Sequence, residues 1–73
     1  MGKNDVIYLN PPDVCDLCHA PLAEDFIDGR TRFGAWANLC LRCWTFSGAG
    51  RLGTGLGHWY HRQADGRFHK VEG

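Results

Sequence analysis

Apolar residues in this chain occur in short runs separated by glycine, proline and charged residues. Residues 6–9 form the first run, and the sequence NPPD at residues 10–13 ends it. Proline has no backbone N–H and a fixed φ, so residues 10–13 cannot belong to a helix or to a central strand. We therefore expect residues 1–13 to form an irregular or edge-strand arm.

A β-hairpin followed by a short helix is predicted in the middle of the chain. The dipeptide Asp28-Gly29 is typical of a two-residue hairpin turn, and it lies between Phe26-Ile27 and residues 30–33. The hairpin would extend through residues 34–39. After it, the spacing of Leu41 and Trp44 predicts a helix of about two turns that ends at Gly48.

Aromatic side chains are the expected core. Those around the predicted hairpin and helix are Phe26, Phe33, Trp36 and Trp44, and Trp59 and Tyr60 would close the core from the far side of a glycine-rich segment. The tail contains a second Asp-Gly turn at residues 65–66. It either pairs as a strand through Phe68 and Val71 or frays.

Four cysteines provide the strongest chemical signal. Cys15 and Cys18 form one C-x-x-C pair, Cys40 and Cys43 form another, and 21 residues separate the pairs. Two such pairs can surround one metal ion with four thiolates and leave no position for a substrate. Soft thiolates in a tetrahedral array favour Zn²⁺, and a chain of 73 residues needs such a staple because its core is small.

The alternatives to structural zinc are iron in a rubredoxin-like site, redox chemistry and disulfides. Iron knuckles usually place glycine after the second cysteine, whereas His19 and Trp44 stand there. His19 itself could act as a ligand, but four cysteines already complete the shell. The expected organisation is an arm of residues 1–13, a four-cysteine zinc-binding domain of residues 14–63, and a tail or short edge strand of residues 64–73.

The sequence carries no apolar run long enough to cross a bilayer and no signal-peptide hydrophobic region at its start. We therefore expect a cytoplasmic protein, whose thiols stay reduced and bind metal, with no membrane partner and no small-molecule substrate.

The order of knuckle, hairpin, second knuckle and helix resembles that of treble-clef zinc fingers, from residue 14 to residue 48. The segment GAWANLCLRCWTFSG resembles the second knuckle of GATA-type fingers and a segment of HNH endonucleases. Most of the chain also looks like small zinc-finger proteins of bacteriophages, a group that carries no settled function. The resemblance implies a small zinc-stabilised α+β fold of treble-clef type, acting in the host cytoplasm if the chain is phage-encoded.

Nuclease activity is a less favoured interpretation of the HNH likeness. Asn38, Leu39, Cys40 and Cys43 match that motif, but Trp44 stands where those enzymes have a metal-binding histidine. The predicted hairpin also has no histidine to act as a base. We therefore expect a protein that is not an enzyme. A second metal held by His58, His61 and His69 is a further minor hypothesis.

Residues 48–57 contain five glycines and a formal G-x-G-x-x-G. A dinucleotide-binding loop needs a hydrophobic strand before the glycines and a helix after them, and neither is predicted here. Three explanations remain for the alternating Gly53, Gly55 and Gly57. Their backbone amides bind phosphate, another protein strand docks on them, or the segment wraps tightly across Trp36 or Trp44 where a Cβ would clash.

Charge is distributed unevenly. Residues 1–29 hold one basic and six acidic residues, residues 30–73 hold seven basic and two acidic ones, and no acidic residue lies between Gly29 and Ala64. An acid-free basic span favours an anionic partner, so the leading hypothesis is a non-enzymatic zinc module that binds nucleic acid, a regulatory protein of phage type. Its phosphate contacts would be Arg30, Arg32, Arg42, Arg51 and Arg62, with Trp59 or Tyr60 stacking on bases. The alternative is a small adaptor that docks on a host or phage protein through its acidic front half or its glycine-rich segment.

Overall fold

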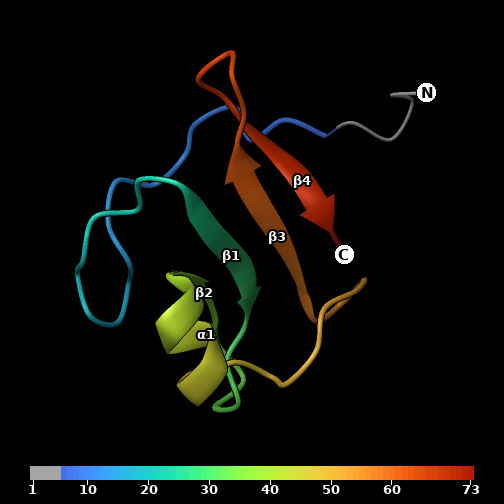
Figure 1. Ribbon diagram of the computed structural model, residues 1–73. Coiled ribbons are helices and arrows are strands. Elements are labelled where there is room, and N and C mark those ends of the chain that lie inside the picture. Colours follow the sequence, from blue (N-terminus) through green and yellow to red (C-terminus); the bar gives the residue numbers. More distant parts are fainter. Residues whose placement is uncertain (1–5) are drawn as a thin grey trace.

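The computed structural model describes residues 6–73 and shows a small α+β fold. Its elements in chain order are β1 (Asp25–Arg30), β2 (Trp36–Leu39), α1 (Leu41–Ser47), β3 (Gly57–Arg62) and β4 (Phe68–Glu72). The four strands form one antiparallel sheet in the order β2-β1-β3-β4, and α1 packs at the β1–β2 end (Figure 1). The predicted α+β class is confirmed.

The β1–β2 hairpin forms, but the predicted position of its turn is wrong. Asp28 and Gly29 lie inside β1, paired with Asn38 and Ala37 of β2. The chain turns instead at residues 31–35, where the N–H of Thr31 donates to the carbonyl of Ala35 at 2.8 Å. Gly34 takes φ +101 in this turn, a conformation that favours glycine.

The helix predicted after Cys40 is confirmed as α1, Leu41–Ser47. Cys40 is its N-cap, and its C-cap is Gly48, whose N–H donates to the carbonyl of Trp44. No helix in residues 6–73 has the length and apolar character needed to cross a bilayer.

The buried core lies mainly between the sheet and the N-terminal arm. Phe26 stacks on Tyr60 at a centroid distance of 5.2 Å, and Phe68 meets Phe26 edge-on. Tyr8 of the arm covers both Phe26 and Tyr60, in edge contacts of 5.0 Å. The prediction of Phe26 and Tyr60 as core residues is confirmed, and the arm completes this side of the molecule.

Two aromatic residues expected in the core are exposed instead. Phe33 is 73% exposed in the β1–β2 turn and Trp36 is 49% exposed at the start of β2. The aromatic residues of the buried cluster are instead Phe26, Tyr60 and Phe68. The sequence pattern does not predict β3, the strand that lies beside β1.

Residues 6–8 of the N-terminal arm pair with β4. The N–H of Tyr8 donates to the carbonyl of Phe68, and the N–H of Lys70 donates to the carbonyl of Val6. The arm therefore pairs with the outer edge of β4 from Val6 onwards, which supports the edge-strand expectation for that part. Residues 1–5 lie outside the described residues.

Trp44 fastens α1 to the opposite face of the sheet. Gly29 and Gly57 are cross-strand partners. An added Cβ would lie 2.8 Å from the Trp44 ring at Gly29 and 3.2 Å from it at Gly57. A Cβ at Gly48 would overlap the same ring. Three glycines thus provide a slot without side chains in which the indole lies.

Candidate metal centre

Two loops present the four cysteines, and in each loop a backbone N–H donates to the first sulfur. In the first loop, the N–H of Leu17 donates to Sγ of Cys15 at 3.4 Å. In the second, the N–H of Cys43 donates to Sγ of Cys40 at 3.4 Å, at the first turn of α1. These N–H groups stabilise negative charge on the first sulfur of each pair.

Asp16 joins the first loop to the end of β2. Its N–H donates to the carbonyl of Asn38 at 2.8 Å, and its Oδ2 accepts from the N–H of Asn38 at 2.7 Å. Because Cys40 directly follows the last residue of β2, these two hydrogen bonds hold Cys15 and Cys18 close to the second cysteine pair. Residues far apart in the sequence thereby form one cluster.

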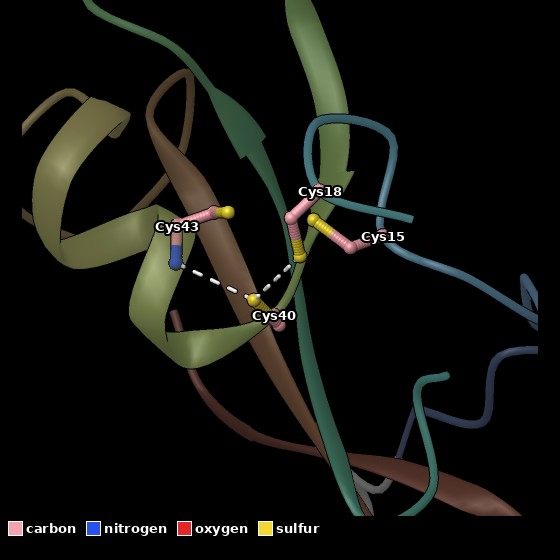
Figure 2. Close-up of side chains that lie close together, drawn as sticks. All are labelled: Cys15, Cys18, Cys40 and Cys43. Atoms are coloured by element: carbon pink, nitrogen blue, oxygen red, sulfur yellow. Dashed lines mark hydrogen bonds between the residues drawn. The ribbon is translucent and has the colours of Figure 1, made fainter. Parts of the chain in front are cut away.

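The four sulfur atoms face one another and lie within 4.8 Å of each other, as Figure 2 shows. Sγ of Cys18 is 3.7 Å from Sγ of Cys40. Cys15 is fully buried and Cys18 is exposed, so the cluster lies at the surface with one side against the core. The four cysteines are arranged to hold a metal ion, as the sequence predicted.

Histidine takes no part in this grouping. Within residues 6–73, the four cysteines are the only group of three or more candidate ligands close enough to share an ion. His19 is exposed, and its φ of 63 is the left-handed conformation that glycine usually supplies. His61 binds Asp25 through Nδ1 at 2.7 Å, and Nδ1 of His58 lies 3.2 Å from the carbonyl of Gly73.

The thiols of the cluster differ in acidity. Burial alone raises the pKa of Cys15, but backbone N–H groups of Cys18, Cys40 and Leu17 outweigh it and lower that pKa to about 6. For Cys43, burial and hydrogen bonding to the neighbouring sulfurs raise the pKa to about 12. The first thiolate therefore forms at Cys15, and Cys43 keeps its proton until a cation offsets the accumulated negative charge.

Metal affinity is expected to rise with pH, because protons compete with the ion for sulfur. Cys15, whose folded pKa is lowered, is already ionised at neutral pH, whereas the Cys43 proton must leave on binding. Titration calorimetry in two buffers of different ionisation enthalpy, at about pH 7.5, should find fewer than four protons released per ion bound. Affinity that does not change between about pH 6 and pH 8 would contradict thiolate ligation.

The structure places the five candidate phosphate-binding arginines in two different settings. Arg30, Arg32, Arg42 and Arg51 are exposed. Within residues 6–73 none of these four forms an ion pair. The fifth differs: Arg62 donates to the carbonyls of Ala23 and Gly66, and its guanidinium lies 4.6 Å above the Phe68 ring. Arg62 therefore holds the fold together at the far end of β3.

The two candidate stacking residues differ in exposure. Tyr60 is 7% exposed and its ring packs on Phe26, so the expectation that it stacks on a base is corrected. Trp59 is half-buried, and its Nε1 donates to Oδ1 of Asp25 at 2.9 Å. Both rings belong to the body of the sheet.

The alternating glycines Gly53, Gly55 and Gly57 have two different structural roles. Gly57 is buried in β3 and contacts Trp44, which agrees with the tight-wrap explanation. Gly53 and Gly55 have open space around them and take φ +137 and +81, so they are needed for backbone conformation in the turn before β3. The carbonyl of Gly53 accepts from the N–H groups of Leu56 and Gly57 at 2.9 Å.

Three exposed aromatic residues were not predicted from the sequence as candidate site residues: Phe33, Trp36 and Phe46. Phe46 is 66% exposed on the outer side of α1. The first two are expected in the core from their sequence, and nothing in the pattern assigns a place to Phe46. Phe33 is exposed because it lies in the turn at residues 31–35, whose position the local pattern does not reveal.

Comparison of the chain with known protein families, curated proteins and solved structures finds no match to any of them.

Proposed function

We propose that the protein is a non-enzymatic zinc module that binds nucleic acid. Zn²⁺ fits the cysteine cluster because tetrahedral Zn–S bonds of about 2.3 Å separate two sulfurs by about 3.8 Å. The Cys18 and Cys40 sulfurs are 3.7 Å apart. Four thiolates also match the preference of zinc for soft ligands.

A structural role for zinc follows from the closed ligand set. Four cysteine ligands leave no coordination position for a substrate or an activated water. The order of a first cysteine loop, a hairpin, and a helix that begins at the second loop supports the treble-clef assignment for residues 14–48. The role of the ion would be to hold α1 and the hairpin in fixed relation.

One observation supports nucleic-acid binding: three exposed arginines at the β1–β2 end form no ion pair within residues 6–73. We call them the free arginines. Arg32 lies in the β1–β2 turn, and its N–H donates to the carbonyl of Ser47 at the end of α1. Arg30 is the last residue of β1, and Arg42 lies in α1, the helix that this contact joins to the turn. Since no acidic residue occurs between Gly29 and Ala64, these guanidinium groups have no nearby carboxylate in the same span to neutralise them.

Fluorescence anisotropy with short single- and double-stranded DNA and RNA, at two salt concentrations, tests this proposal. Binding should weaken with salt because phosphate contacts release counterions. Arg32→Gln should weaken binding and remove about one phosphate contact from the salt slope. Arg67→Gln is the matched control, because Arg67 is exposed in the β3–β4 turn. Absence of salt-dependent binding at tens of micromolar protein would exclude the proposal.

The adaptor alternative rests on the acidic front half of the chain. Asp13, Asp16 and Glu24 are exposed, away from the free arginines in the sequence. Under this alternative a basic protein partner would dock there. Asp13→Asn with Glu24→Gln would then abolish partner retention in a pull-down, and Arg32→Gln would leave it unchanged.

A further inference from the structure

Each of the three exposed aromatic residues at the β1–β2 end has an arginine beside it. Arg32 lies next to Phe33 in the turn, with its guanidinium carbon 5.7 Å from the ring centroid. Arg30 and Trp36 are cross-strand partners in β1 and β2. Such partners project from the same face of a sheet with their Cβ atoms about 5 Å apart.

The third pair lies on α1. Arg42 and Phe46 are four residues apart in the helix, so they occupy neighbouring positions on one helix face. Both are exposed, whereas Trp44 points to the sheet and Cys43 to the metal site. The outer face of α1 therefore repeats the pairing found in the turn and across the strands.

Main-chain contacts bring the three pairs to one end of the molecule. The N–H of Arg32 donates to the carbonyl of Ser47, the residue after Phe46, at 2.8 Å. The N–H of Ala49 donates to the carbonyl of Arg30 at 2.8 Å. Figure 1 shows the β1–β2 turn beside the last turn of α1. Arg30 and Trp36 alternate along their strands with Gly29 and Ala37, so they project from the sheet face opposite α1, and the three pairs lie around the end of the sheet and not on one face. We call these six residues the arginine–aromatic surface: Arg30, Arg32, Phe33, Trp36, Arg42 and Phe46.

We propose that the arginine–aromatic surface binds single-stranded nucleic acid, with unpaired bases stacking on Phe33, Trp36 and Phe46 and phosphates bound by the paired arginines. The inference rests on the proposed function and names its substrate class. Unpaired bases expose flat faces that stack on aromatic rings, whereas the bases of a duplex are already stacked on each other. Each ring with its neighbouring arginine offers a face for one base beside a cation for one phosphate.

Charge disfavours a second copy of this chain as the occupant. Two copies meeting through this surface would bring the three arginines of each copy together, and none of the six residues is acidic. Like charges placed opposite one another at an interface are destabilising. An anionic ligand would neutralise the arginines, and a ligand with flat aromatic groups would also cover the exposed rings.

The test compares leucine and tryptophan at the same exposed positions. Phe33→Leu with Phe46→Leu keeps apolar side chains and all three arginines but removes two π faces. Base stacking contributes about 5- to 150-fold in affinity per base, so this double variant should bind a single-stranded oligonucleotide at least about 10-fold more weakly than wild type. Phe33→Trp with Phe46→Trp should bind as tightly as wild type or more tightly.

Wild-type protein should also prefer single-stranded over double-stranded oligonucleotides of the same sequence. All variants should keep the wild-type metal content and melting temperature, because Phe33 and Phe46 are 73% and 66% exposed. Val71→Ala, at a 49% exposed position in β4, is the matched control for loss of exposed apolar area.

The outcomes separate the two proposals. Salt-dependent binding that is equal for duplex and single strand, and unchanged in the leucine variant, would overturn the stacking inference and leave nucleic-acid binding standing. No binding to any oligonucleotide would overturn both. Trp36→Leu gives an independent check at the third ring, and its failure to weaken single-strand binding would exclude Trp36 from the stacking set.

Discussion

Removal of the metal is expected to unfold the whole chain. Through its four ligands the ion would join the first loop, the end of β2 and the start of α1, and α1 is a seven-residue helix. Isolated helices of this length are unstable in water. A structural zinc site contributes about 10–16 kcal/mol of apparent binding free energy, comparable with or larger than the whole stability of a small domain.

Circular dichroism and amide NMR spectra measure this outcome. Adding a chelator should collapse the amide dispersion and remove the cooperative thermal transition, and one equivalent of Zn²⁺ per chain should restore both. Cys18→Ser should have the same effect as the chelator. Cys18 is the exposed member of the cluster, so this substitution removes a ligand without altering a buried side chain.

Leu17→Ser is the matched control for Cys18→Ser. It places serine in the same loop at a 43% exposed position and leaves all four sulfurs in place. It should retain the metal and most of the melting temperature. A chelated protein that keeps its amide spectrum would contradict the structural role of the metal and remove the support for a zinc-organised surface.

The parts of the molecule that the sequence predicted correctly depend on local chemistry. The two C-x-x-C pairs specify their own loops, because each first sulfur accepts from a backbone N–H two or three residues later. The α1 helix begins at one of these loops and ends at Gly48, so its bounds also follow from neighbouring residues. These features need no knowledge of distant packing.

The misplaced hairpin turn shows where local preference is overruled. Asp28-Gly29 has the composition of a two-residue turn, but Gly29 is required inside β1 because Trp44 leaves no room for a Cβ there. The partner position on β3 is also glycine, Gly57. A glycine that permits close packing and a glycine that permits a turn are identical in sequence.

The exposed aromatic residues could not be identified without β3. Phe33 and Trp36 resemble core residues because a small domain needs an aromatic core, and the pattern does not reveal that Phe68 joins Phe26 and Tyr60 in that core instead. Once β3 pairs with β1, the aromatic residues of the turn and of β2 are left facing solvent. The candidate ligand surface therefore becomes visible only in the folded sheet.

The substitution Gly48→Ala is expected to destabilise the protein by about 3 kcal/mol or more, and to lower its melting temperature by more than about 10 °C. Gly48 has φ −75, which any residue adopts, so backbone strain plays no part. The added methyl would overlap the Trp44 ring and lie 2.6 Å from its carbonyl oxygen. The ring cannot move away without losing its place against Gly29 and Gly57.

Gly50→Ala is the matched comparison, two residues further along. Gly50 takes φ +103 with nothing within 4 Å of an added Cβ, so alanine there suffers backbone strain of roughly 1–2 kcal/mol and no collision. Thermal denaturation of the metal-loaded variants should rank Gly48→Ala as the more damaging. In a Trp44→Leu background the cost of Gly48→Ala should shrink by about 1 kcal/mol or more, because the ring it strikes is gone. An equal or milder effect of Gly48→Ala, or a cost that is unchanged by Trp44→Leu, would mean that the glycine-lined slot does not hold α1 to the sheet.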